Sequence, residues 1–263
     1  MKIFFLLNVK TKNYIKKNFF LFKFFFILFR NLPLTIKKII LPCEREYYIL
    51  NHILKKNFFR ILDIGGGMGE SIISFKNLNK NVLIDTYEPN YNNYKLCKKL
   101  EKSYANVRVN NFAYGNSRIK KYLYIPVIDD LRIDNFSGTK ISDINLNIKK
   151  NFPTNEIKYL KQIVKFKKNK KKYDLIKIDC EADVYDVVKN VSNNIHSTTV
   201  LMIEFCSDMK KIYLFLKKKN NYECYFFKKK NLLKLNLMSK KKHKKSLNVL
   251  FIPEQSWINK SSR

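Results

Sequence analysis

The sequence predicts an α/β fold with a mostly parallel sheet. Short apolar runs alternate with amphipathic segments along most of the chain, and a glycine-rich turn joins the first run to the segment after it. Hydrophobic residues make up 46% of the 263 positions, so the chain can build one domain with a large core and is not globally disordered. Alternating strand and helix signals are typical of βαβ units, whose helices cover both faces of a parallel sheet.

The first predicted strand, residues 60–64, leads directly into the loop Gly65-Gly66-Gly67-Met68-Gly69. Glycines let the backbone turn sharply and approach a ligand, and the following helix presents unpaired N–H groups. A dinucleotide fingerprint would need a glycine at position 70, where the chain has Glu70. That carboxylate disfavours a pyrophosphate and suits a cationic ligand. The alternative is a glycine-rich turn without a ligand. Candidate ligand contacts here are Asp63, Gly65, Gly67 and Gly69.

The second predicted strand, residues 82–88, ends in Glu88, about twenty residues beyond the loop. Nucleotide-binding folds place an acid at this offset to bind ribose hydroxyls, and a carboxylate can accept from both hydroxyls at once. Pro89 stops the strand, and Asn90 is suited to cap the next helix. A strand-end Glu by itself is usually a solvated loop residue, but this spacing favours ligand binding.

The other elements follow the same alternation. A helix is expected near residues 91–103, a third strand near 107–113, a turn at 114–116 and an extended segment at 119–126. Strand signals resume at 173–179, followed by a helix near 184–191, a strand at 198–205 and a helix near 209–219. Residues 222–227 and 247–252 flank a Lys-rich connection and predict a closing antiparallel pair.

The predicted domain organisation has an N-terminal aromatic and basic extension, residues 1–45, before a main domain over 46–263. Within that domain, residues 127–172 are basic and are expected to be irregular, as an insertion or lid. The aromatic stretch 19–29 is about half the ~20 residues needed to cross a bilayer and contains Lys23. Two interpretations remain open: a helix packed on the main domain, or a helix lying on a membrane surface. No small-residue cleavage site of a secretory signal follows the N-terminus.

The formal net charge of +32 is weak evidence for a specific nucleic-acid partner. Only seven of the 53 basic residues are Arg, whose fork reads phosphates and bases bidentately, and Lys runs are usually solvated loops. Only nonspecific, salt-sensitive attraction to polyanions is expected.

Acidic residues, in contrast, fall in or just after the predicted central strands. Because parallel sheets bind ligands at the carboxyl ends of their strands, these acids are expected to line one crevice and attract a cation. The nine are Asp63, Glu70, Asp85, Glu88, Asp179, Glu181, Asp183, Asp186 and Glu204.

The five cysteines show no C-x-x-C spacing, and the three histidines lie far apart. No metal-binding motif is visible, so no metal is expected. Scattered cysteines of this kind are typical of a reducing cytoplasm.

Together these motifs resemble the FkbM family of class I, S-adenosylmethionine-dependent methyltransferases, over about residues 58–206. The narrowest part of the resemblance is Lys177-Ile178-Asp179-x-Glu181. The other parts are the glycine loop, Glu88-Pro89-Asn90, Ala113-x-Gly115-Asn116 and Ser137-Gly138-Thr139. The resemblance implies a Rossmann-like class I methyltransferase fold and S-adenosylmethionine as cofactor, with Asn90 and Ala113 added to the cofactor contacts.

Characterised members of that family O-methylate hydroxyls of sugars and natural products, so the resemblance implies a sugar, glycan or other small-molecule acceptor. Asp179 and Glu181 are the candidate catalytic residues, because a strand-end carboxylate over the cofactor can serve as a base; Asp179 could equally cap the strand-to-helix turn. The chain departs from the family pattern at Ala182 and Val184, where the family has Gly and Glu. Alternatives are an RNA methyltransferase and a degenerate protein that binds the cofactor without activity.

Overall fold

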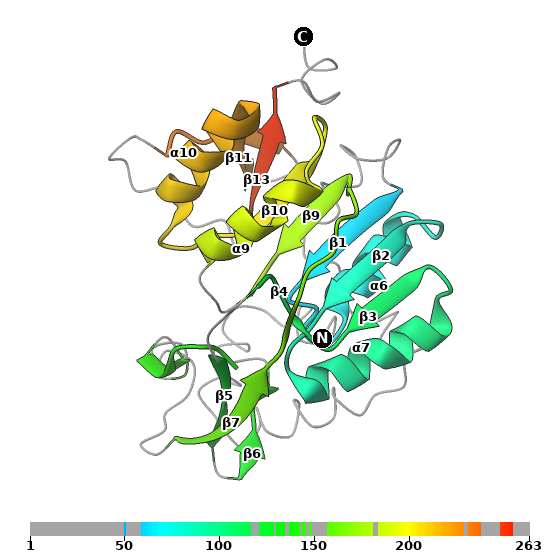
Figure 1. Cartoon of the computed structure of the whole chain (residues 1–263), viewed down its shortest axis with the longest axis vertical. Helices are drawn as coiled ribbons and strands as arrows, with labels where there is room; N and C mark the ends of the chain where they lie inside the picture. Colours follow the sequence, from blue (N-terminus) through cyan, green and yellow to red (C-terminus); the bar gives the residue numbers. More distant parts are fainter. Residues whose placement is uncertain are drawn as a thin grey trace.

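The computed structural model contains an eight-stranded sheet in the order β12-β11-β13-β10-β9-β1-β2-β3 (Figure 1). The structure describes residues 50, 59–116, 121–128, 130–134, 137–142, 144–145, 148, 157–180, 184–228, 231–237 and 248–254. The strands of the sheet are β1 (Arg60–Ile64), β2 (Leu83–Tyr87), β3 (Val107–Asn110), β9 (Leu175–Ile178), β10 (Val200–Glu204), β11 (Tyr222–Lys228), β12 (Asn231–Lys234) and β13 (Asn248–Pro253).

The central five strands, β10-β9-β1-β2-β3, are all parallel. The chain builds β2 and β3 on one side of β1 and later returns to build β9 and β10 on the other side. The strand order therefore reverses between β1 and β9, and open α/β sheets bind ligands at the carboxyl ends of the strands at such a point. The predicted Rossmann-like α/β fold is confirmed.

The closing strands also match the prediction. β13 is antiparallel both to β10 and to β11, so it lies inside the sheet with β11 beyond it. The Lys-rich connection contributes one further strand, β12, which pairs with the edge of β11 and was not expected from the sequence.

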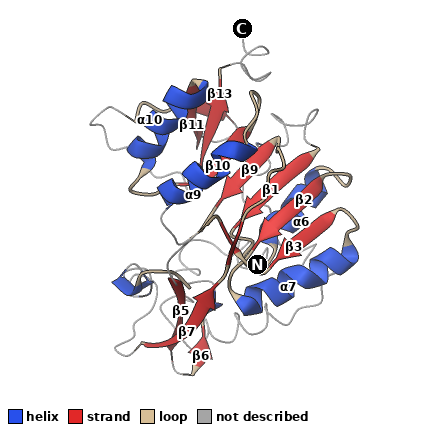
Figure 2. Ribbon diagram, in the orientation of Figure 1, coloured by secondary structure: helices blue, strands red, loops and turns tan. Residues whose placement is uncertain are grey.

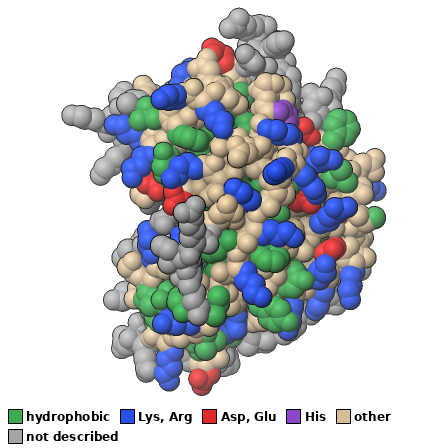
Figure 3. Space-filling view, viewed as in Figure 1, with side chains coloured by type: hydrophobic (Ala, Val, Ile, Leu, Met, Phe, Trp, Pro, Cys, Tyr) green, Lys and Arg blue, Asp and Glu red, His purple; other side chains and the backbone are tan. Residues whose placement is uncertain are grey.

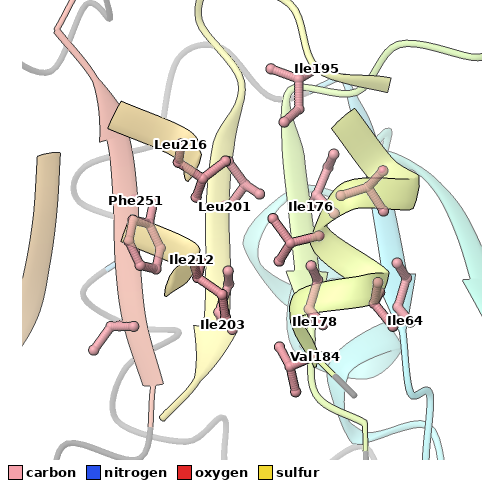
Figure 4. Packing of buried hydrophobic residues seen from close by; sticks show 14 of the residues in the cluster. Ile64, Ile176, Ile178, Val184, Ile195, Leu201, Ile203, Ile212, Leu216 and Phe251 are labelled. Atoms are coloured by element: carbon pink, nitrogen blue, oxygen red, sulfur yellow. The ribbon is translucent and has the colours of Figure 1, made fainter. Parts of the chain in front are cut away.

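Helices cover both faces of the sheet, as predicted (Figure 2). α9 (Val184–Val191) and α10 (Met209–Asn220) pack on one face, and α6 (Glu70–Leu78) and α7 (Tyr91–Ser103) pack on the other. Strand side chains alternate between the faces. The side chains that pack against α9 and α10 therefore include Ile64, Ile178 and Ile203 (Figure 4). Those that pack on the other face, with α6 and α7, include Leu175 and Met202.

The segment after β3 is more regular than the sequence indicated. β4 (Ala113–Tyr114) pairs with β8 (Phe166–Lys167), while β5 (Lys121–Ile128) pairs along β7 (Lys158–Val164) and β6 (Leu131–Arg132). The expectation of irregular structure over 127–172 is wrong for β6, β7 and β8. The reason is that only Val164 in β7 is buried, so the strand is held by pairing with β5 and shows no hydrophobic alternation.

This inserted three-stranded sheet has its own small core of Ile128, Ile133, Ile144 and Ile148. It lies below the main sheet in Figure 1. The predicted N-terminal extension, residues 1–45 with its aromatic stretch 19–29, lies outside the described residues. Among the described helices, none has the length and apolar character needed to span a bilayer.

We expect the α9 and α10 face to carry much of the stability. Leu201→Ala in β10, which is fully buried, should destabilise the protein by about 2–5 kcal/mol, because it removes packed atoms and leaves a cavity. Leu214→Ala on α10 is the matched control: that side chain is 49% exposed, and its loss should change stability by less than about 0.5 kcal/mol. Urea unfolding measures both, and equal losses would contradict this placement of the core.

Candidate active site

The glycine loop leaves β1 at the point where the strand order reverses. Gly65 has φ +84°, and its N–H donates to the Tyr87 carbonyl at 2.9 Å. A Cβ at Gly65 would lie 1.7 Å from the backbone oxygen of Asp179, so only glycine fits between β1 and β9. Gly69 is similarly closed in: a Cβ there would lie 2.3 Å from Leu100 of α7.

Gly67 differs from its neighbours. It also has a positive φ, +52°, but among the described residues a Cβ there would meet only the Glu70 carboxylate, at 3.6 Å. The loop therefore offers its open side at Gly67, and Gly65 and Gly69 shape the loop by close packing against the protein. The sequence predicted a ligand contact at all three glycines, whereas in the structure Gly65 and Gly69 are closely packed and Gly67 is not.

Glu88 lies at the carboxyl end of β2 and bridges the loop to the next helix. Its Oε2 accepts from the Gly67 N–H at 2.8 Å, and its Oε1 accepts from the Asn90 N–H at 2.8 Å. Each carboxylate oxygen has a second lone pair, so the group can accept further hydrogen bonds. Burial raises the pKa of Glu88 to about 8, although the hydrogen bonds from the Asn90 and Gly67 N–H groups act to lower it.

Asn90 is fully buried and engaged at both ends of its amide. Its Oδ1 accepts from the N–H groups of Asn92 and Asn93, so it caps α7 as the sequence indicated. Its Nδ2 donates to Asp134 Oδ1 at 3.0 Å and to Ser137 at 3.3 Å. The residue predicted as a cofactor contact therefore joins Glu88 to the inserted sheet.

A buried lysine occupies the reversal point itself. Lys177 of β9 is 3% exposed, and its ammonium lies 3.0 Å from Asp179 Oδ2 and 3.5 Å from Asp63 Oδ1. It also donates to the Gly65 carbonyl at 3.3 Å. One ammonium thus joins β1, β9 and the glycine loop. These residues meet because positions 63 of β1 and 177 of β9 are in register on the same face of the sheet.

Asp63 is fully enclosed by protein. Its Oδ2 accepts from Ser71 of α6 at 2.7 Å and from Thr86 of β2 at 3.2 Å. Burial raises the pKa of Asp63, although Lys177 and the two hydroxyls lower it. Because Asp63 has no exposed surface, its role is to stabilise the packing of β1 against α6 and β2, and it does not present its carboxylate to a ligand.

Asp179, in contrast, has a side chain that is 42% exposed. Burial acts to raise its pKa, but the Lys177 ammonium and a hydrogen bond from Glu204 outweigh this, and the net pKa lies below the usual value. Asp179 is therefore an ionised, accessible carboxylate beside the loop. Glu204 ends β10 as Asp179 follows β9, so the two acids stand on neighbouring parallel strands.

The structure brings together part of the expected acidic set. Asp63 and Asp179 contact Lys177 directly, and Glu70 and Glu88 lie close enough to interact with its charge. Burial raises the pKa of Glu70 as well. Two predicted members lie elsewhere: Asp85 pairs with Lys171 and Tyr173, and Asp186 pairs with Lys189. Glu181 and Asp183 lie outside the described residues.

The prediction that Asp85 lines the same crevice as the other acids is wrong. Strand side chains alternate, so Asp85 faces the side opposite Thr86 and Glu88. A position near the end of a strand does not by itself determine which face of the sheet the side chain occupies. The same alternation, applied to positions 177 and 179, would have identified Lys177 as a member of the site.

Ala113 lies in β4, where it pairs with Phe166 and packs beside the small cluster of Leu123, Ile125 and Val164. Its contacts are thus with the inserted segment. Among the described residues, no group of three or more His, Cys, Asp or Glu side chains is arranged to hold a metal ion.

Comparison with known proteins gives structural neighbours only. No family model matches the sequence, and no curated protein matches it. The chain aligns over 81% of its length with 84% of a Staphylococcus aureus protein described as a caffeoyl-CoA O-methyltransferase, at 14% identity and TM-score 0.44. A SAM-dependent O-methyltransferase from Thermotoga maritima aligns at 10% identity and TM-score 0.42, over 81% of this chain and 65% of that one.

A third neighbour is the precorrin-6y C5,15-methyltransferase from Geobacter metallireducens, at 14% identity and TM-score 0.41, over 78% of this chain and 84% of that one. Likeness at this level carries no residue assignments, so the geometry of the site has to support any function.

Glu88 makes a testable contribution to stability against pH. Its pKa is raised from 4.5 to about 8 in the folded protein, so the folded state binds more protons than the unfolded state between these values. Stability should therefore fall as pH rises through this window, by at most about 1.4 kcal/mol per pH unit from this group. Urea unfolding from pH 5 to 9 should show a shallower fall in Glu88→Gln. Parallel curves for the two proteins would contradict the raised pKa.

Proposed function

We propose that this chain is an S-adenosylmethionine-dependent methyltransferase that methylates a hydroxyl of a sugar, glycan or other small molecule. The observation that carries the proposal is the Glu88 carboxylate, bonded to the Gly67 N–H at the carboxyl ends of a parallel sheet beside its reversal point. The resemblance to the FkbM family supports the acceptor class, through the sequence Lys177-Ile178-Asp179 at the end of β9.

The residues present fit this cofactor. Gly67 leaves the loop open on one side, and Glu88 retains lone pairs for the two ribose hydroxyls. The charges fit as well: the ionised Asp179 lies beside the Lys177 ammonium, and Glu70 and Glu88, whose pKa values burial raises, add negative charge when they ionise, which favours a cationic sulfonium and disfavours the pyrophosphate of a dinucleotide.

S-adenosylmethionine supplies a methyl group on a sulfonium, which is already a good leaving group, so alignment of the acceptor contributes most of the rate gain. We assign the alignment of the acceptor to Asp179. Its exposed carboxylate can accept a hydrogen bond from the acceptor hydroxyl, and Lys177 holds it ionised. Because its pKa is lowered, Asp179 is a weak base and a good orienting group, and the hydroxyl proton passes to it only as the new C–O bond forms.

The first functional prediction concerns binding. Calorimetry should show S-adenosylmethionine binding to the wild type, with no competition from NADH. Gly67→Arg should abolish binding, because it fills the open side of the loop. Glu88→Ala should weaken it by about tenfold to a hundredfold, since a carboxylate that accepts hydrogen bonds is worth about 1.5–3 kcal/mol.

Two controls make this result specific. Asp85→Asn changes an equally buried strand carboxylate on the opposite face, and it should leave the affinity unchanged provided that the protein stays folded. Affinity should also rise as pH increases through about 8, where Glu88 ionises. Equal affinity in wild type, Gly67→Arg and Glu88→Ala would remove the basis of the proposal.

The second functional prediction concerns chemistry. Asp179→Asn should keep cofactor affinity nearly unchanged while methyl transfer falls by about a hundredfold, the scale on which loss of a positioned catalytic carboxylate acts. Radiolabelled methyl transfer to a panel of saccharides, and to RNA as the alternative acceptor, measures it. If Asp179→Asn abolishes cofactor binding or unfolds the protein, the residue is structural. If the wild type is inactive and Ala182→Gly with Val184→Glu restores transfer, the chain is a degenerate binding protein.

A further inference from the structure

Two carboxyl groups stand side by side at the carboxyl edge of the sheet, where β9 and β10 are adjacent strands (Figure 1). Ile178 stands opposite Ile203 in their parallel pairing, so the next residues, Asp179 and Glu204, are also neighbours. Strand side chains alternate, so both carboxyl groups lie on the face that carries Lys177. Neighbouring strands are about 4.8 Å apart, which brings such side chains within hydrogen-bonding reach of each other.

A hydrogen bond joins the two carboxyl groups: Glu204 donates and Asp179 accepts. An ionised carboxyl group can only accept, so a hydrogen bond between two carboxyl groups requires that one of them carries a proton. Two negative charges on adjacent strands would also repel each other, and one member of such a pair then keeps its proton. The pair therefore holds one proton and one negative charge.

Lys177 determines which member of the pair is ionised. Its ammonium lies 3.0 Å from Asp179 Oδ2 and stabilises the anionic form of that group. Burial acts to raise the pKa of Asp179, but the Lys177 charge outweighs it and the net pKa lies below the usual value. Asp179 is therefore the ionised member, and the proton resides on Glu204. Lysine side chains are visible over much of the surface in Figure 3, but Lys177 is buried, so its charge acts at short range on this pair.

Two other segments supply groups near Glu204. β13 places Asn248 opposite it, and that side chain is buried and uncharged. The segment after β10 supplies Cys206 and Asp208. Burial raises the pKa of the Cys206 thiol, and negative charge at Asp208 and Glu204 acts in the same direction, so the thiol is neutral at pH 7. An amide, a thiol and a further acid do not stabilise an anion at Glu204, so these neighbours also favour its protonated form.

We propose that Glu204 is a protonated carboxyl group that positions Asp179 for the methyl acceptor, through the hydrogen bond that it donates. The inference rests on the proposed function and adds the residue that orients the acceptor-binding carboxylate. Lys177 and Glu204 both bind Asp179 and fix its orientation, while its exposed part accepts from the acceptor hydroxyl. Glu204 keeps its proton throughout, because the hydroxyl proton passes to Asp179 as the methyl–oxygen bond forms. When Glu204 ionises at alkaline pH, it repels Asp179 and the alignment is lost.

The first test measures the proton on Glu204 and requires no activity. The full-length protein is labelled with ¹³C at the side-chain carboxyl carbon of its glutamates, and NMR follows these carbons over the pH range in which the protein stays folded. The Glu204 signal is the one that is absent from Glu204→Gln. We expect Glu204 to be still protonated at pH 7 in the wild type. In Asp179→Asn, which removes the neighbouring anion, it should ionise near the ordinary Glu value of about 4.3.

Glu223 of β11 is the control within the same spectra. Burial acts to raise its pKa, but hydrogen bonds and charge from Lys217 and Lys234 outweigh this and lower it, so Glu223 should ionise below the usual range. The inference is overturned if Glu204 of the wild type ionises in the ordinary range of a glutamate. Because the wild-type titration alone gives this answer, the test holds even if Asp179→Asn fails to fold.

The second test distinguishes a positioning group from a base. Glu204→Gln keeps an N–H donor beside Asp179, whereas Glu204→Ala removes the donor. We expect methyl transfer by Glu204→Gln to stay within about threefold of the wild type, and transfer by Glu204→Ala to fall about tenfold to a hundredfold, because a hydrogen bond to a charged group is worth about 1.5–3 kcal/mol. At alkaline pH the wild type should lose activity and Glu204→Gln should not. Equal losses in the two variants at neutral pH would identify Glu204 as a base and overturn the inference.

S-adenosylhomocysteine binding separates this inference from the proposed function. It should be unchanged in both Glu204 variants, because the proposed cofactor contacts are Gly67 and Glu88. If the wild type binds no cofactor, the proposed function fails, and the NMR titration still reports whether Glu204 holds a proton beside Asp179. If the cofactor binds and Glu204 ionises as an ordinary glutamate, the proposed function stands and the positioning role of Glu204 is overturned.

Discussion

The ammonium of Lys177, enclosed between Asp63 and Asp179, is the interaction on which the rest of the site depends. Removing charges from water is costly, and a buried pair is retained only where its geometry and hydrogen bonds compensate. Ser71 and Thr86 donate to Asp63 Oδ2, and Lys177 donates to the Gly65 carbonyl, whereas Asp63 Oδ1 accepts no hydrogen bond from the described residues and faces the Lys177 ammonium at 3.5 Å. The central strands and the glycine loop are thereby fixed relative to one another, and a carboxylate excess is left facing outward at Asp179.

A second series of hydrogen bonds runs from the glycine loop to the inserted sheet. Glu88 accepts from the N–H groups of Gly67 and Asn90. The Asn90 side chain donates to Asp134, which also forms an ion pair with Arg132 at 2.6 Å. The cofactor loop and the inserted sheet are thus only a few hydrogen bonds apart. A ligand that changes the ionisation of Glu88 changes the first hydrogen bond of this series, whose other end lies at Asp134 beside β6.

Much of the parallel sheet and the glycine loop could be predicted from sequence, because buried strands, amphipathic helices and glycine turns leave strong local patterns. Helices α7 and α9 begin and end at the expected residues, and Asn90 caps α7. The inserted strands could not be predicted, since β7 buries only Val164 and is held by its partner strand. The site was predicted in part: acids near strand ends were recognised, but Asp85 faces the wrong side of the sheet, and Lys177 is a cation that a search for acids overlooks.

The position of β13 has a consequence for the order in which the sheet can assemble. Among the described strands, β11 pairs with the sheet only through β13, and β12 only through β11, so neither has a partner strand on the parallel core until β13 has inserted beside β10. Until then β10 presents an unpaired hydrophobic edge, and α10 lacks Phe251 beneath it. Closure of the sheet therefore joins segments distant in sequence, an intrinsically slow step during which the open edge of β10 is the place where two incompletely folded molecules would pair with each other.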